Sequence, residues 1–78
     1  MSTSLIKHEP LASAVRCDET HLHVTLLDGR ELSVPLAWFP RLRHASAAAR
    51  DRCALIGHGS GIHWEDLDED ISVRALFV

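Results

Sequence analysis

Histidines are the residues of this chain that most directly suggest chemistry, because imidazole nitrogen is a common metal ligand. There are six in 78 residues, and His21 and His23 stand two apart in a segment where apolar and polar residues alternate. Both side chains would lie on one face of a strand, where His63 or Asp66 could complete a site. A His-x-His pair alone lacks the close ligand spacing of a zinc motif. We therefore predict no metal and no cofactor, and keep a metal or small-ligand site at His21, His23 and His63 as a third hypothesis.

Carboxylates form one dense run near the C-terminal end. General acid–base catalysis requires two carboxyl groups whose environments separate their pKa values, whereas successive residues of a surface loop are solvated alike. The run is therefore interpreted either as a set of ion-pairing and capping groups or as an acidic contact face for a basic partner. The predicted partner contacts are Arg41, Glu65, Asp66, Asp68, Glu69 and Asp70.

Patterns typical of enzymes are missing from the sequence. Ser60 does not lie in the G-x-S-x-G turn of a hydrolase nucleophile, and the segment 57–61 lacks the Lys-Ser/Thr ending of a phosphate-binding loop. Its glycines indicate a turn with positive φ at two or three positions. Cys17 and Cys53 form no CxxC motif and are expected to be reduced, buried side chains. We therefore expect no enzymatic activity.

Arginines supply the main alternative, a nucleic-acid-binding accessory protein. Phosphate contact is local and can occur on a mildly acidic protein. The net charge is −3, however, and the chain contains neither Asn nor Gln, two residues that read base edges. The four arginines that would make the contact are Arg41, Arg43, Arg50 and Arg52.

The element that the sequence indicates most clearly is a β-hairpin. Apolar and polar residues alternate over 21–26 and again over 31–36, with Asp28-Gly29 between them. A two-residue turn would place apolar residues opposite polar ones, whereas a three-residue loop over 27–29, with its glycine left-handed, aligns the apolar faces. Because the buried face sets the register, we predict the longer loop. The expected pairs are Val24 with Leu32 and Leu22 with Val34.

Weaker patterns predict the remaining elements. We expect a strand over 11–18, a short helix beginning at Pro40, a helix over 46–52 with Ser46 as N-cap, and an extended segment over 62–64. Residues 53–56 either continue that helix or form a strand. The segment 71–78 forms either a last helix capped by Asp70 or Ser72 or a final strand. The expected core residues are Trp38, Phe39, Leu42, Ile62, Trp64 and Leu67.

Length and composition set the fold class. A chain of 78 residues with 46% hydrophobic and 24% charged residues can bury one small core, which excludes two domains. We predict a single α+β domain over 1–78, with a small antiparallel sheet of three to five strands and one or two short helices packed on it. Residues 1–10 are expected to be frayed or loosely ordered. No apolar stretch suits a membrane span or a secretion signal, so a cytoplasmic location is expected.

The combination of three motifs resembles a known family. They are W-F-P-R-L over 38–42, G-I-H-W over 61–64 and L-D-E-D-I-S-V over 67–73. Together they are similar to the small bacterial domain-of-unknown-function family two-four-four-two, over roughly 14–76. The resemblance implies a small α+β fold and no established activity. Members occur alone, fused to helix-turn-helix domains, or encoded beside another small protein in pairs that look like toxin–antitoxin systems.

These observations favour a non-enzymatic protein–protein interaction module, with an antitoxin-like role as the finer expectation. Because the chain ends just after the last motif, we expect no appended DNA-binding domain. The expected partner is a small protein, basic in charge and encoded by a neighbouring gene, and it would contact a sheet face or the acidic run.

Overall fold

The computed structural model describes residues 10–77, so the expectation of a loosely ordered segment over 1–10 lies outside the described residues except for Pro10. Within these described residues, six strands, two short α-helices and three 3₁₀ turns follow one another. In order they are β1 (Ala12–Cys17), β2 (His21–Leu26), β3 (Glu31–Pro35), η2 (Leu36–Trp38), α1 (Pro40–Arg43), α2 (Ala47–Asp51), β4 (Cys53–Ile56), η3 (Gly57–Gly59), β5 (Gly61–Trp64), β6 (Glu69–Ser72) and η4 (Arg74–Leu76).

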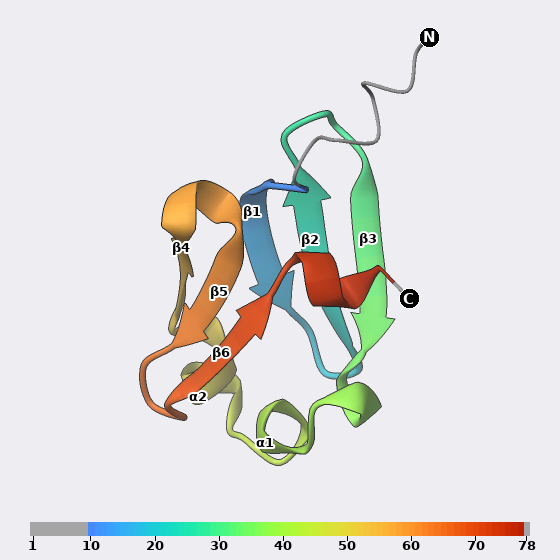
Figure 1. Ribbon diagram of the computed structural model, residues 1–78. Helices are drawn as coiled ribbons and strands as arrows, with labels where there is room; N and C mark the ends of the chain where they lie inside the picture. Colours follow the sequence, from blue (N-terminus) through green and yellow to red (C-terminus); the bar gives the residue numbers. More distant parts are fainter. Residues whose placement is uncertain (1–9, 78) are drawn as a thin grey trace, which may run out of the picture.

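The strands form two antiparallel three-stranded sheets, one in the order β1-β2-β3 and the other in the order β4-β5-β6. The sheets meet where β1 packs beside β4, and α1 and α2 lie together at one end of both sheets (Figure 1). The predicted α+β class is confirmed, with the strands divided between two sheets. The segment 53–56, whose pattern fitted helix or strand, is strand β4.

The predicted hairpin register is confirmed. Val24 pairs with Leu32 and Leu22 pairs with Val34 across β2 and β3. The loop holds three residues, because the backbone N–H of Leu26 donates to the carbonyl of Arg30 at 2.8 Å. Gly29 has φ +95° and is therefore in the left-handed region, where glycine carries no steric penalty.

The core lies between the two sheets, and residues of the C-terminal segment after β6 cover one side of it. β2 contributes alternate side chains, as its alternation predicted, and Trp64 on β5 has no exposed surface. Val73 and Leu76, at the start and within η4, are also buried. Of the predicted core, Leu42, Ile62 and Trp64 are fully buried, whereas Phe39 and Leu67 are partly buried and pack against the cluster.

Trp38 is not part of the core, which corrects the sequence-based expectation. Its residue surface is 49% exposed. The reason is the 3₁₀ turn η2, in which residues three apart share a face. Leu36 and Phe39 occupy the inward side, where the Phe39 N–H donates to the Leu36 carbonyl at 2.8 Å. Trp38 lies between them in the chain and is directed outward.

The two helices begin where their residues predict. Pro40 is the first residue of α1, and the Ser46 side chain caps α2 by accepting the backbone N–H of Ala49 at 3.1 Å. A hydrogen bond links α2 to the second sheet: the Trp64 indole N–H donates to the Arg50 carbonyl at 3.1 Å.

The glycine-rich segment forms the tight turn η3 beside the first strand. Gly57, His58 and Gly59 all have positive φ, as the sequence predicted for two or three positions. A side-chain carbon at Gly59 would collide with the backbone carbonyl of Ala12 at the start of β1. The segment therefore joins the sheets by close backbone approach.

The C-terminal segment is a strand followed by a single 3₁₀ turn. The predicted alternative of a helix capped by Asp70 or Ser72 is wrong, because both residues belong to strand β6. Pairing with β5 places Ile71 opposite Ile62 in the core, and this long-range burial determines the strand conformation.

Candidate functional site

The acidic run 65–70 spans the turn between β5 and β6 and the start of β6, and it does not form a single patch. Side chains alternate between the two faces of a strand, so Glu69 and Asp70 point to opposite faces of the second sheet. Asp70 is opposite His63 in the register, and Glu69 is opposite the buried Trp64. The predicted contact residues are therefore distributed over three separate groups, with Asp68 outside all of them.

The first group is centred on His63, on the outer face of the sheet. Its Nδ1 lies 2.5 Å from Asp70 Oδ1 and its Nε2 lies 3.2 Å from Glu65 Oε1. Only the imidazolium can donate from both nitrogens at once. The hydrogen bond with Asp70, supported by Glu65, therefore raises the pKa of His63 above its ordinary value of 6.5.

The second group, Arg41 and Glu69, links the acidic turn to α1. The Arg41 guanidinium donates to the carbonyl of Leu67 at 3.2 Å, and its Nε lies 3.8 Å from Glu69 Oε1. The third group joins Arg52 to Asp66, with 3.5 Å between Nε and Oδ2. Arg41 and two of the carboxylates thus have partners within the chain, in line with the ion-pairing interpretation of the run.

Asp68 is at the tip of the turn and is exposed. Its φ of +50° is in the left-handed region, where Asp and Asn are better tolerated than most side chains. No ion pair links it to another residue in 10–77. Its charge is therefore directed to solvent.

The Arg50 side chain donates hydrogen bonds to backbone carbonyls around the end of α1. Its Nη1 donates to the carbonyls of Leu42, Arg43 and Ala45, at 3.2, 3.5 and 2.9 Å. The end of a short helix leaves carbonyls exposed. Of these three, the Leu42 carbonyl also accepts the backbone N–H of Ala45 at 3.2 Å. Among the four arginines of the nucleic-acid hypothesis, Arg50 is consequently a structural residue.

The histidines proposed as metal ligands are held by other partners. His23 Nε2 lies 2.7 Å from Asp18 Oδ2, and its Nδ1 lies 2.7 Å from Ser33 Oγ. The rings of His21 and His23 are 6.0 Å apart, whereas His63 is in the other sheet. Within residues 10–77, no group of three or more His, Cys, Asp or Glu side chains is arranged to hold a metal.

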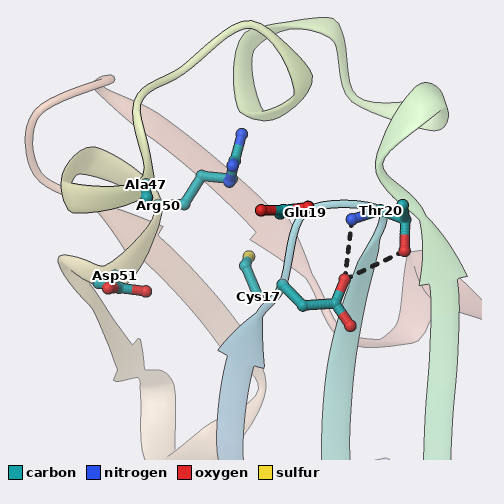
Figure 2. A pocket seen from close by; sticks show the side chains of 7 residues that line it. Cys17, Glu19, Thr20, Ala47, Arg50 and Asp51 are labelled. Atoms are coloured by element: carbon teal, nitrogen blue, oxygen red, sulfur yellow. Dashed lines mark hydrogen bonds between the residues drawn. The ribbon is translucent and has the colours of Figure 1, made fainter.

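A hollow of about 590 Å³ lies between the turn after β1 and helix α2 (Figure 2). Burial raises the pKa of the Cys17 thiol to about 11, with a smaller contribution from Cys53. Both cysteines are free and partly buried, and a protonated thiol is a weak nucleophile. The lining residues are Cys17, Asp18, Glu19, Thr20, Ala47, Arg50 and Asp51.

Sequence reasoning missed the part played by His63. It grouped this residue with His21 and His23, and it treated the carboxylates as one loop. The signal that could have found the pair is the spacing between Trp64 and Glu69: a four-residue turn over 65–68 sets His63 opposite Asp70.

Comparison with known proteins identifies relatives but no activity. A model of the family described as "Protein of unknown function (DUF2442)" matches residues 12–78. A search of curated proteins found no match. The chain is similar to a solved crystal structure of a protein of unknown function from Rhodospirillum rubrum ATCC 11170. The two are 32% identical with a TM-score of 0.79, over 88% of this chain and 86% of that chain. Among residues 10–77 there is no helix with the length and apolar character that a membrane span requires.

Proposed function

This chain belongs to DUF2442, a family of proteins of unknown function, and we propose that it is a non-enzymatic protein–protein interaction module. In this proposal its partner is a small basic protein encoded by a neighbouring gene. The acidic turn 65–70 and the outer face of the second sheet bind that partner.

The observation that carries the proposal is the exposure of two carboxylates that share one imidazole. The side chains of Glu65 and Asp70 are 78% and 68% exposed, and in this structure the ionic partner of each is His63. A single imidazolium balances at most one of the two charges. The neighbouring Asp68 adds a further exposed charge. This local excess of negative charge attracts a basic partner and increases its rate of association.

Trp38 supports an interaction role independently. It is a large aromatic side chain left half exposed beside α1, and exposed tryptophans are frequent anchors of protein interfaces. Arg41 on α1 connects the neighbourhood of Trp38 to the acidic turn, because its guanidinium donates to the carbonyl of Leu67. A partner that covers both features would contact charge and apolar surface together.

The arginines favour a protein partner over a nucleic acid. Arg50 donates to three carbonyls, and Arg41 and Arg52 lie beside carboxylates of the chain itself. Phosphate binding would compete with these contacts, and the net charge of −3 opposes it at longer range.

The finer part of the proposal is an antitoxin-like role, in which this chain neutralises a toxic partner. The test is co-expression of the tagged chain with the product of the adjacent reading frame, followed by size-exclusion chromatography with light scattering. We expect a stoichiometric complex, and we expect co-expression to relieve growth arrest caused by the partner alone. A free monomer in the presence of that product would contradict the interaction role. A complex without growth arrest would contradict only the antitoxin-like part.

A further inference from the structure

The outer face of the second sheet is exposed or partly exposed at every position, and its residues form two rows. The register places Ile56, Gly61 and Ser72 in one row. Ala54, His63 and Asp70 form the next row, two residues along each strand. Because Gly61 has no side chain, the surface is recessed in the middle of the first row.

A hollow of about 440 Å³ results, lined by Ile56, Ser60, Gly61, Asp70, Ile71 and Ser72. One side is the apolar side chain of Ile56, which is 43% exposed. The far end is the exposed carboxylate of Asp70. The face thus combines an apolar wall, a floor of bare backbone and a negative charge at one end.

We propose that this hollow binds a Lys or Arg side chain from an extended basic segment of the partner. The hydrocarbon stem lies over Gly61 against Ile56, and the cationic group contacts Asp70. This inference rests on the proposed function and identifies the surface and the side-chain chemistry that it uses.

Charge complementarity and length select this occupant. Lys and Arg bury an apolar stem while keeping the charged end in water, which matches an apolar wall that ends at a carboxylate. Ser72 and Asp70 are two residues apart on β6, and a strand advances roughly 6.6 Å over two residues. An extended lysine side chain has a similar reach. A purely apolar side chain would leave the Asp70 end unmatched, and an acidic one would be repelled.

The test uses two blocked pentapeptides, acetyl-Thr-Val-Lys-Val-Thr-amide and its twin with norleucine in place of lysine. Amide NMR spectra of the full chain are recorded during titration with each peptide at one fixed pH. We expect shifts confined to the hollow, at the amides of Ile56, Gly61, Asp70 and Ser72. The lysine peptide should bind about three- to fivefold more tightly, as expected for one exposed ion pair.

Two variants and a matched control decide the outcome. Asp70→Asn should remove the difference between the peptides. Gly61→Val should weaken both, because its side chain takes the space over the backbone and displaces Ile56, whose Cγ1 lies 3.1 Å from the position of a side-chain carbon at residue 61. The Gly61 backbone is outside the left-handed region, so the larger residue adds no backbone strain. Glu31→Gln makes the same change of charge on β3 of the first sheet, away from the hollow, and should leave the ratio unaltered. Equal affinities, shifts elsewhere, no shifts, or a ratio that survives Asp70→Asn would overturn the inference.

The same variants separate this inference from the proposed function. If the wild-type chain and both hollow variants form the complex with the adjacent gene product equally well, the hollow is not the contact surface, but the interaction role stands. If the peptide result holds and no complex forms, the hollow binds basic side chains and the proposed partner is wrong.

Discussion

His63 on β5 and Asp70 on β6 lie directly opposite each other, with 2.5 Å between Nδ1 and Oδ1. The pair connects two features that look unrelated in the sequence, a histidine-containing strand and an acidic run. It also places an exposed carboxylate at the end of the hollow on the outer face of the second sheet.

This pair predicts a specific dependence on pH. The pKa of His63 is raised above 6.5 in the folded chain, so its contribution to stability is fully present below the unfolded pKa and is lost as pH rises through the folded value. Histidine NMR titration should show His63 with an elevated pKa, and Asp70→Asn should lower it towards 6.5. A His63 that titrates at or below 6.5 in the wild-type chain would refute the prediction.

Asp18 makes the opposite contribution. Hydrogen bonds from His23 and from the backbone N–H groups of Thr20 and His21 hold the pKa of this carboxyl well below its usual range. The stability that it adds is present above an unfolded value near 3.8 and is lost as pH falls through the folded pKa. Acid denaturation followed by circular dichroism should begin at higher pH in Asp18→Ala than in the wild type. Coincident acid transitions would argue against this role.

The two tryptophans should respond differently to substitution. Trp38 is half exposed and Trp64 is fully buried. Trp38→Ala is expected to change the free energy of unfolding by less than about 1 kcal/mol, whereas Trp64→Phe leaves a cavity and orphans the Arg50 carbonyl, at a cost of about 2–4 kcal/mol. Urea denaturation measures both, and acrylamide should quench Trp38 fluorescence preferentially. Similar losses for the two variants would contradict the assignment.

Arg50 is expected to matter for stability and not for partner binding. Arg50→Ala removes the side-chain donor of the Leu42, Arg43 and Ala45 carbonyls, of which Leu42 keeps the backbone N–H of Ala45. It should lower the free energy of unfolding by about 1–2 kcal/mol. Arg43→Ala, on the exposed side of α1, is the matched control and should be nearly neutral. Equal effects of the two substitutions in urea denaturation would show that the cap contributes little.

The local alternation of apolar and polar residues, together with helix-start residues, was sufficient to predict much of the fold. The hairpin register followed from matching apolar faces around Gly29, and the helix starts at Pro40 and Ala47 followed from Pro40 and Ser46. The features that were missed depend on contacts distant in sequence. Ile71 adopts a strand conformation because it pairs with Ile62 in the core. Trp38 points outward because a 3₁₀ turn directs Leu36 and Phe39 into the core.

The candidate site was only partly predictable for the same reason. The ion-pairing interpretation of the acidic run fits Asp66 and Glu69, but sequence alone did not place Glu69 and Asp70 on opposite faces. That separation requires knowing that β6 begins at Glu69 and pairs with β5. The hollow at Gly61 could not be predicted either, since it depends on which neighbours flank that glycine across two strands.

The most direct test of the interaction role is the dissociation constant between this chain and the product of the adjacent reading frame. It should be measured for the wild type, for the double variant Glu65→Gln/Asp70→Asn, and for Glu31→Gln, an exposed carboxylate on the first sheet, as control. We predict that the double variant binds about five- to tenfold more weakly, and that added salt weakens the wild-type complex. No binding by the wild-type chain would contradict the interaction role, and an unchanged dissociation constant in the double variant would contradict the assignment of Glu65 and Asp70 to its contact surface.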